Sequence, residues 1–542
     1  MADEAPRVVI VGGGHNGLVA AGLLAKRGAS VSVLERRSKV GGAAVTEQPW
    51  GPHYKMTALS YVMSIMPPAI LDELQLARHG YRIHPQHGYF APLPDGRALQ
   101  LSGTPAQRHA SIAQFSSRDA EAHPRWEAWL GDLANTLGPL LSAVPPRLGS
   151  KRPSDLLDQA RLAWKVRNLD QRGVGDVTRL FTMSIADLLE EWFESDPMQG
   201  VLAVSGVIGT WAGPRSAGTA FVMAHHQIGD LGDGQITGEW GFPEGGMGAV
   251  SEALRAAAES FGARIRTDCT VARVVVRNGR AQGVALDTGE ELAADLVVTT
   301  LHPKYAFLDH LDRNDLPDDF VAGIERWRTR SGTVKVNLAL DRLPDFLSHP
   351  GVDPLVHGGT IVLAPSLDTI EGAFQDAGAG RAAAEPFADI CIPSVFDRTL
   401  APEGHHVMSM FTQWVPHQFA EAHHPDELDA YAERVIARVE ALAPGFTNSI
   451  LHRQVIGPYE MEHTYGLVGG NIFHGELTPS QMFHMRPVPG WADFTTPIAG
   501  LYFAGSATHG GGGVTGIPAL QVVRRIEHDR RTGALAKLRR RR

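Results

Sequence analysis

Apolar residues follow two different spacings in the first 36 residues of the chain. Residues 7–11 (RVVIV) form a short β-branched run, which is typical of a buried strand. Residues 18–29 (LVAAGLLAKRGA) then place apolar side chains at helical spacing, and residues 30–35 (SVSVLE) return to a strand pattern. Strand, helix and strand in this order predict the beginning of a parallel sheet with a crossover helix.

Later segments show both patterns again. Residues 273–286 (RVVVRNGRAQGVAL) predict a hairpin, because Asn-Gly separates two apolar runs. Residues 104–240 have a largely helical pattern, whereas strands are predicted at 332–341, 388–394 and 405–416, and a helix at 425–445. At 542 residues the chain is long enough for two or more domains.

Three glycines lie between the first strand and the first helix. Gly12, Gly14 and Gly17 have the spacing G-x-G-x-x-G. The first permits a tight turn, the second lets the backbone approach a pyrophosphate, and the third lets helix and strand pack closely. Glu35 ends the second strand, where such folds place an acid that accepts hydrogen bonds from ribose hydroxyls. These residues predict a dinucleotide site, for either FAD or NAD.

The composition excludes several classes of protein. Charged residues make up 20% of the chain and the net charge is -9, so we expect a folded protein with no nucleic-acid partner. Cys269 and Cys391 are the only cysteines and form no C-x-x-C pair, so no dithiol redox centre is encoded. The first residues leave no room for a signal peptide, and no apolar run reaches transmembrane length. We expect a cytoplasmic protein, or one of an organelle matrix.

Three segments resemble one family of flavoproteins. Gly41 and Gly42 closely follow the ribose acid, and residues 241–303 contain a Gly-Gly-Met turn, a helix and a strand pair. Residues 500–526 (GLYFAGSATHGGGGVTGIPALQVVRRI) run from a strand into a glycine cluster and a helix. These features resemble the amine-oxidase and phytoene-desaturase superfamily of FAD-dependent oxidoreductases. With residues 459–519, the resemblance is closest to the branch of the pyridine nucleotide-disulphide oxidoreductase domain-containing protein 2, and it implies FAD as the cofactor.

The resemblance and the glycine motif together imply a set of FAD-binding residues. By resemblance, Val271 lies where the backbone meets the adenine, and the C-terminal glycine cluster contacts the pyrophosphate and the isoalloxazine. The complete set is Gly12, Gly14, Asn16, Gly17, Glu35, Arg36, Gly41, Gly42, Val271, Gly505, Ser506, Gly513 and Val514.

The fold class that follows is α/β, with a Rossmann-type FAD-binding domain of the discontinuous, GR2-like kind and an inserted α+β substrate domain. We expect residues 1–100, 241–330 and 460–542 to form the FAD-binding domain. Residues 101–240 and 331–459 are expected to form the substrate-binding and helical domain. Only one G-x-G-x-x-G follows a strand, so we expect no second fold for a nicotinamide.

These features predict an FAD-dependent oxidoreductase that dehydrogenates, desaturates or isomerises an apolar small molecule. Hydride would pass to the flavin, and oxygen or a quinone would serve as electron acceptor. Two alternatives stay open. One is an amine or amino-acid oxidase, and the other is a flavoprotein with a structural or regulatory role and little turnover.

Histidine is the candidate catalytic base, because a neutral imidazole titrates near pH 7. His474 and His509 are the preferred pair, and hydrogen-bonded packing against the cofactor domain is the alternative for each. The adjacent histidine pairs lack the i, i+4 spacing of a helical metal site, so no metal is expected.

The sequence leaves two interpretations open for each of two further segments. Residues 58–76 are apolar and contain methionine, and form either core or the entrance for a lipophilic substrate. Residues 530–542 (RRTGALAKLRRRR) are either a solvated end or a basic segment in peripheral contact with a membrane. A homodimer is a further expectation.

Overall fold

A computed structural model describes residues 5–151, 153–165, 167, 169–228 and 240–533. Its first sheet is parallel, with five strands in the order β19-β13-β1-β2-β9. They are β1 (Arg7–Val11), β2 (Ser30–Leu34), β9 (Arg264–Arg266), β13 (Leu296–Thr299) and β19 (Leu501–Phe503). All carboxyl ends therefore meet at one edge, and three distant parts of the sequence contribute to that edge.

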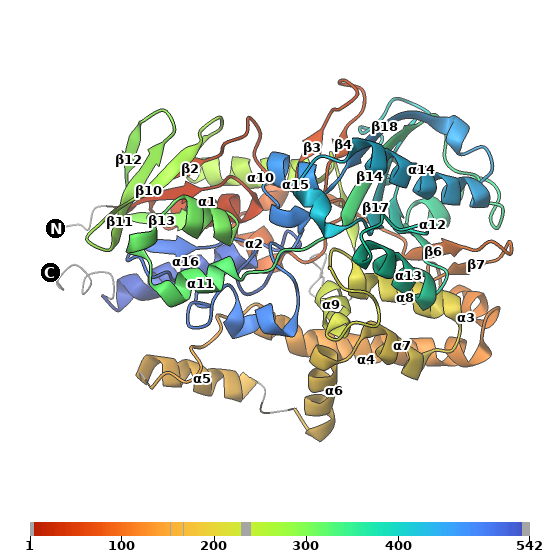
Figure 1. Cartoon of the computed structure of the whole chain (residues 1–542), viewed down its shortest axis with the longest axis horizontal. Coiled ribbons are helices and arrows are strands. Elements are labelled where there is room, and N and C mark those ends of the chain that lie inside the picture. Colours follow the sequence, from red (N-terminus) through yellow and green to blue (C-terminus); the bar gives the residue numbers. More distant parts are fainter. Residues whose placement is uncertain (1–4, 152, 166, 168, 229–239, 534–542) are drawn as a thin grey trace.

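Helices cover one face of this sheet. Helix α1 (His15–Lys26) packs against α10 (Met247–Ser260) and α16 (Ile517–Arg531), and the three share one apolar core with β1, β2 and β13. Figure 1 shows α1 and α16 beside the sheet strands. The crossover predicted from the first 36 residues is thus confirmed.

The opposite face packs against a smaller antiparallel sheet. Its strands are β10 (Val271–Arg277), β11 (Arg280–Leu286) and β12 (Glu291–Ala293), and α11 (Asp318–Glu325) shares the same core. Asn278 and Gly279 both have positive φ, of 52° and 68°, as a two-residue type I′ hairpin turn requires. The hairpin predicted from the sequence is therefore confirmed.

The second large sheet has seven strands, in the order β18-β14-β17-β16-β15-β6-β7. They are β6 (Tyr89–Pro92), β7 (Ala98–Gln100), β14 (Thr333–Leu340), β15 (Thr360–Leu363), β16 (Phe387–Cys391), β17 (His406–Gln413) and β18 (Ile450–Ile456). The predicted strands at 332–341, 388–394 and 405–416 correspond to β14, β16 and β17. Because β6 and β7 join this sheet, the first 100 residues contribute to both large sheets.

The seven-stranded sheet has one apolar and one polar face, and both are buried. Along β14, alternate residues from Val334 to Leu340 pack into the largest apolar core, while Lys335 and Asn337 point to the other side. Asp389 and Ser409 occupy the same polar face on neighbouring strands, as the register shows. A buried face with charged groups departs from ordinary core patterning and indicates a functional surface.

Helices complete the molecule around this sheet. The helical region consists of α3 (Pro105–Ala113), α4 (Ser117–Leu141), α5 (Pro153–Lys165), α6 (Gln171–Thr182), α7 (Ile185–Trp192), α8 (Asp196–Val207) and α9 (Thr219–His226). Hydroxyl or carboxylate caps fix several starts, for example Thr104 before α3 and Ser184 before α7. Helices α13 (Leu367–Gly378) and α14 (Pro425–Leu442) lie beside the sheet (Figure 1), and α14 matches the helix predicted at 425–445.

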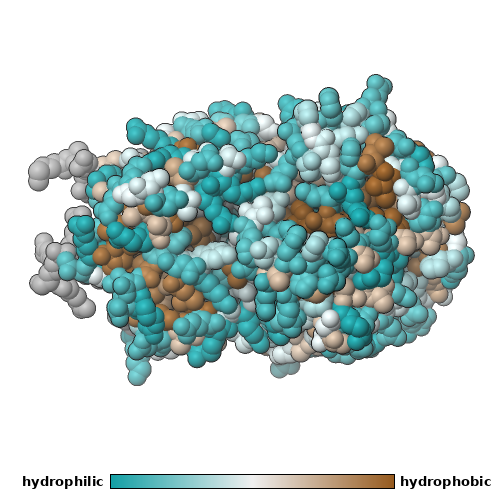
Figure 2. Space-filling model, turned by 45° about the horizontal axis from the view of Figure 1, so that its top comes forward, coloured by the Kyte–Doolittle hydropathy of each residue, from teal (hydrophilic) through white to brown (hydrophobic). Residues whose placement is uncertain are grey.

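The arrangement is the predicted α/β class with a Rossmann-type sheet and an additional mixed sheet. The exact domain boundaries stay a prediction. The face in Figure 2 is hydrophilic over most of its area, with apolar residues in a few separate patches. In the described part of the chain, no helix combines the length and apolar character needed to cross a bilayer.

Candidate functional site

A cavity of about 380 Å³ connects the two large sheets. At one end it is lined by Gly12, Glu35 and Thr300, which directly follow or lie near the carboxyl ends of β1, β2 and β13. At the other end it is lined by Tyr89 and Asp389 from the polar face of the seven-stranded sheet. Ligands of open parallel sheets bind at this edge, so the cavity is the candidate site.

The three motif glycines have different surroundings. A Cβ on Gly12, whose φ is +102°, would lie 2.5 Å from the Thr300 hydroxyl, and a Cβ on Gly17 would lie 2.0 Å from the Gly12 carbonyl. At Gly14 a Cβ would meet no atom within 4 Å. Gly12 and Gly17 are therefore required by packing, whereas Gly14 keeps space free within the cavity at the start of α1. No side chain caps that helix start, so its amides are available to an anionic ligand.

Glu35 is fixed at the cavity wall by two backbone amides. Its Oε2 accepts a hydrogen bond from the Gly13 amide at 2.8 Å, and its Oε1 accepts one from the Arg37 amide at 2.9 Å. A carboxylate has about four acceptor positions, so two remain for ribose hydroxyls. The geometry thus fits the role inferred from the sequence.

Most of the predicted FAD-binding residues line this one cavity. Those that do are Gly12, Gly14, Asn16, Glu35, Arg36, Gly41, Gly42, Val271, Ser506, Gly513 and Val514. Gly17 and Gly505 do not line it, and both are packed against backbone: a Cβ on Gly505 would come within 2.7 Å of the Leu301 carbonyl oxygen. The structure therefore brings together residues separated by almost 500 positions, while the individual FAD contacts stay a prediction.

Several buried polar atoms in the cavity wall have no partner among the described residues. They are Nε2 of His15, Oδ1 of Asn16, Nε2 of His225, Nε2 of His302 and Nδ1 of His474. Buried polar atoms are nearly always hydrogen-bonded in folded proteins, so a group of unpaired ones around a cavity indicates a polar ligand. Burial lowers the pKa of His15 to about 4 and that of His474 to about 3, so both imidazoles are neutral at pH 7.

The structure separates the two histidines proposed as bases. His474 lines the cavity, and its ring centroid lies 5.8 Å from that of His302. His509 does not line the cavity, and its Nε2 forms a 3.0 Å hydrogen bond with the Leu140 carbonyl. A catalytic role stays a prediction for both histidines. Only His474 is placed where its side chain could contact a ligand in the cavity.

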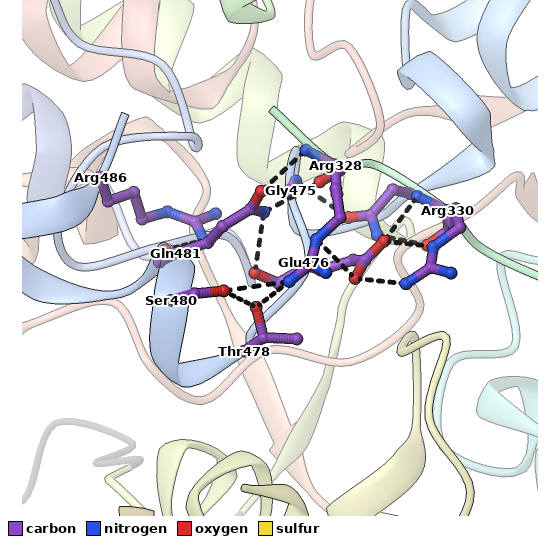
Figure 3. Close-up of polar contacts among 9 residues, drawn as sticks. Arg328, Arg330, Gly475, Glu476, Thr478, Ser480, Gln481 and Arg486 are labelled. Atoms are coloured by element: carbon purple, nitrogen blue, oxygen red, sulfur yellow. Dashed lines mark hydrogen bonds and ion pairs between the residues drawn. The ribbon is translucent and has the colours of Figure 1, made fainter. Parts of the chain in front are cut away.

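One buried arginine holds the segment that carries His474. The Arg486 guanidinium donates to the carbonyl oxygens of Phe473 at 2.6 Å and Ser506 at 3.2 Å, and also to those of Gln481 and Thr508. Figure 3 shows Arg486 directed toward Gln481, within a network that also contains the Arg330–Glu476 ion pair. Burial lowers the Arg486 pKa to about 9, so the guanidinium is still charged at pH 7. Arg486 thus ties the His474 loop to the glycine cluster.

A second polar group lies at the far end of the cavity. Tyr61 donates to Oδ1 of Asp389 at 2.9 Å, and the Lys335 ammonium lies 4.1 Å from the Tyr61 ring centroid. Tyr61 belongs to the segment 58–76, of which residues 59–62 and Ile65 line the cavity. The interpretation of this segment as a substrate contact is therefore in keeping with the geometry.

Sequence reasoning missed five residues of this site. His15 lies inside the glycine motif, and His302 lies just beyond a parallel strand, where ligands bind. Asp389 is a charged residue within an apolar strand pattern, and this unusual position could have identified it from the sequence. Tyr61 lies in the segment 58–76, which the sequence named as a possible substrate entrance, but nothing singled out this residue or Arg486, because their roles depend on contacts with distant residues.

Within the residues that the structure describes, no three His, Cys, Asp or Glu side chains come together as a metal-binding group. Cys269 is partly exposed and Cys391 is buried, and both are free thiols. The absence of metal catalysis stays a prediction.

Comparisons with known proteins show the family of this chain. Residues 17–518 match the family model described as flavin containing amine oxidoreductase. The chain is 39% identical over 530 residues to the pyridine nucleotide-disulfide oxidoreductase domain-containing protein 2 of Rattus norvegicus, covering 94% of this chain and 91% of the relative. It is 25% identical to a carotenoid 3,4-desaturase of Haloarcula japonica, with 94% of each covered.

The fold has solved counterparts as well. A putrescine oxidase structure with bound putrescine superimposes with a TM-score of 0.57 at 15% identity, covering 97% of this chain and 98% of the other. The free space at Gly14, the uncapped helix start and the unpaired polar atoms fit FAD. The protein is an FAD-dependent oxidoreductase. This chain belongs to the flavin containing amine oxidoreductase family.

Proposed function

We propose that the protein dehydrogenates or desaturates an apolar organic substrate. The main support for this proposal is the lining of the cavity beyond the predicted cofactor residues. Its apolar walls there are formed by Val204, Ile208, Phe411, Ile472 and Phe473. Such walls favour a hydrocarbon-like molecule, because its burial removes apolar surface from water. A relative named as a carotenoid desaturase supports the same substrate class.

The chemistry divides between the cofactor and the chain. Bound FAD supplies a two-electron acceptor. The substrate loses a hydride from one carbon and a proton from its neighbour, so a double bond forms. Glu35 and Arg36 would hold the dinucleotide, while the apolar walls would orient the substrate and exclude water. Oxygen or a quinone would be the final electron acceptor, and a redox-neutral isomerisation would be the variant without net transfer.

His474 is our candidate to accept the proton. Its placement supports the role, because its Nδ1 is unpaired at the cavity. Burial lowers its pKa to about 3, so the imidazole is neutral across pH 5–8 but is a weaker base than an exposed histidine. A positioned base contributes roughly 10²- to 10⁴-fold to a rate. His474→Asn is the suitable variant, because asparagine tolerates the positive φ of 56° at this position.

The experiment is an anaerobic screen that follows bleaching of the oxidised-flavin absorbance. Terpene hydrocarbons, polyenes and fatty alcohols form one panel, and primary amines and amino acids form the other. We expect reduction by members of the first panel, slowed in His474→Asn. Reduction by the amine panel alone would establish the amine or amino-acid oxidase, which the buried Asp389 carboxylate keeps as the second candidate. A flavin that no compound reduces would indicate the structural or regulatory role.

Peripheral membrane contact is a further proposal, and the helical region supports it. Residues 147–182 contain eight Lys and Arg against four Asp, a local charge of +4 in a chain of -9. Among the described residues, most exposed large apolar side chains lie here: Leu148, Leu156, Leu157, Trp164 and Val174. Figure 1 shows α5 at the edge of the molecule. Helix α5 itself has two Asp against one Arg and one Lys, so the basic excess comes from its neighbours within 147–182. A segment that is basic overall and exposes apolar side chains favours an anionic bilayer surface.

Vesicle sedimentation tests this proposal. Vesicles with phosphatidylserine should carry down the wild-type protein, and Leu156→Ser with Trp164→Ser should weaken that binding. Equal sedimentation of both proteins would place the contact elsewhere.

The basic end proposed from the sequence extends to residues 534–542, which lie outside the described residues. The homodimer stays a prediction for light scattering.

A further inference from the structure

The far end of the cavity contains a buried carboxylate with one free acceptor atom. Asp389 is 7% exposed and lines the cavity from the polar face of β16. Its Oδ1 accepts the Tyr61 hydroxyl at 2.9 Å, and no hydrogen bond to Oδ2 is formed by the described residues. Because the residue lines the cavity and Oδ2 is not among the enclosed unpaired atoms, this oxygen is accessible to a hydrogen-bond donor of a ligand in the cavity.

The groups around Asp389 determine which donor fits. Lys335 is fully buried, donates to the Ser409 hydroxyl and lies over the Tyr61 ring. Burial lowers the Lys335 pKa to about 7 and raises the Asp389 pKa to about 6. Between these two values, near pH 6.5, both groups are mainly charged, so the carboxylate is accompanied by a cation on the same sheet face. A second cation from a substrate would meet this ammonium, whereas a neutral donor would leave the charges balanced.

The surroundings limit the polar part of the ligand to a small group. The Phe411 ring lies 6.1 Å from the Tyr61 ring, and Val204 and Ile208 line the same cavity from α8 and its end. The nearby Thr360 hydroxyl already donates to Oε1 of Gln86 at 3.3 Å. A single donor on an otherwise apolar body matches this combination of surfaces.

We propose that Asp389, oriented by Tyr61, anchors the substrate through one neutral hydrogen-bond donor, so that the substrate is an apolar molecule carrying a hydroxyl group. Tyr61 is the positioning residue, because it fixes Oδ1 and leaves Oδ2 facing the ligand. The inference rests on the proposed function, since it concerns the substrate part of the same cavity. It adds the one polar feature by which the site would distinguish its substrate from plain hydrocarbons and from amines.

The test uses the FAD-loaded protein and three probes of nearly equal size: toluene, benzyl alcohol and benzylamine. Dissociation constants are measured at pH 6.5, where both Asp389 and Lys335 are mainly charged, from the change in the flavin absorbance spectrum. Benzyl alcohol should bind about tenfold more tightly than toluene, corresponding to one hydrogen bond to a charged group. Benzylamine should gain less than the alcohol over toluene.

Variants then assign the effect to Asp389. Asp389→Leu should bring benzyl alcohol to the affinity of toluene, and Asp389→Asn, which keeps the shape and one acceptor oxygen, should lose part of the preference. Tyr61→Phe should reduce the preference without abolishing it. Asp376→Asn is the matched control, because Asp376 belongs to α13 and does not line the cavity.

The outcomes separate this inference from the proposed function. Equal affinities of the three probes in a protein with bound FAD would overturn the anchor alone. The tightest binding by benzylamine, abolished in Asp389→Asn, would also overturn it and would favour the amine oxidase. A protein that cannot bind FAD would overturn the proposed function and the anchor together.

Discussion

The backbone amide of Gly13 donates a 2.8 Å hydrogen bond to Oε2 of Glu35. This contact joins the glycine turn to the end of β2, so the turn and the acid form one rigid wall of the cofactor cavity. The remaining acceptor positions of the carboxylate are thereby directed before any ligand arrives, which lowers the entropy lost on binding.

Glu35→Gln should loosen FAD by about 1–3 kcal/mol, or about 5- to 150-fold in Kd. The amide side chain has one acceptor oxygen, and its NH₂ group would face the donor amide of either Gly13 or Arg37. Reconstitution of the apoprotein with FAD measures the change. Glu73→Gln, which alters an ion pair with Arg27, is the control and should leave Kd unchanged. Equal affinities of wild type and Glu35→Gln would disprove the role of Glu35.

Gly14→Val and Gly17→Val should fail for different reasons. At position 14 the side chain would enter free space, so the protein should fold and remain colourless. At position 17 the Cβ would overlap the Gly12 carbonyl at 2.0 Å, so the protein should not fold stably. Circular dichroism and flavin absorbance distinguish the two results. A yellow Gly14→Val protein would contradict the placement of the cofactor beside this turn.

Arg486→Met should lower the free energy of unfolding by about 2–5 kcal/mol, because buried carbonyl groups lose their donor. The same change should reduce bound FAD, since Arg486 connects the Phe473 and Ser506 carbonyls. Denaturant unfolding and the flavin-to-protein absorbance ratio measure these effects. Arg342→Met, at an exposed position, is the control. Unchanged stability and flavin content would show that Arg486 does not hold the site together.

Asp389→Asn should stabilise the protein, and increasingly so as the pH rises. Burial raises the folded-state pKa of Asp389 from 3.8 to about 6. Its favourable contribution is therefore complete below pH 3.8 and is lost as the pH rises through about 6, whereas asparagine does not titrate. The advantage of the variant should grow by about 1–2 kcal/mol between pH 5 and pH 8.

Thermal or denaturant unfolding of both proteins at several pH values provides the measurement. The titratable groups that face Asp389 are Tyr61, Lys335, Cys391 and Tyr89. The Asp389 carboxylate raises the pKa of Lys335, so the difference between the proteins reports the coupled titration of Asp389 and Lys335. A difference that does not change with pH would contradict a carboxylate with a raised pKa.

The sequence predicted the cofactor end of the site better than the substrate end. Gly12, Gly14 and Glu35 lie within one strand-helix-strand unit, so their spacing alone indicates their joint role. Tyr61 and Asp389 are separated by 328 positions, and only the pairing of β16 within the second sheet brings them together. Long-range sheet topology of this kind leaves no periodic signal in a single sequence.

The two histidines illustrate the same limit. His474 and His509 have the same chemistry and belong to neighbouring segments of the sequence. The loop held by Arg486 places one in the cavity wall, while the other pairs with the Leu140 carbonyl of α4. Residue type was therefore enough to name the two histidines as candidate bases. Which of their side chains reaches the cavity depended on tertiary contacts that the sequence does not reveal.

Anaerobic stopped-flow reduction of the bound FAD tests the central claim most directly. The FAD-loaded protein is mixed separately with NADH, with NADPH and with the apolar compounds that bleach the flavin in the screen. The account predicts saturable reduction by an apolar compound, and slow, unsaturable reduction by either nucleotide. Saturable reduction by NADH or NADPH at about 1 per second or faster, without reduction by any apolar compound, would contradict it and would make the protein a reductase.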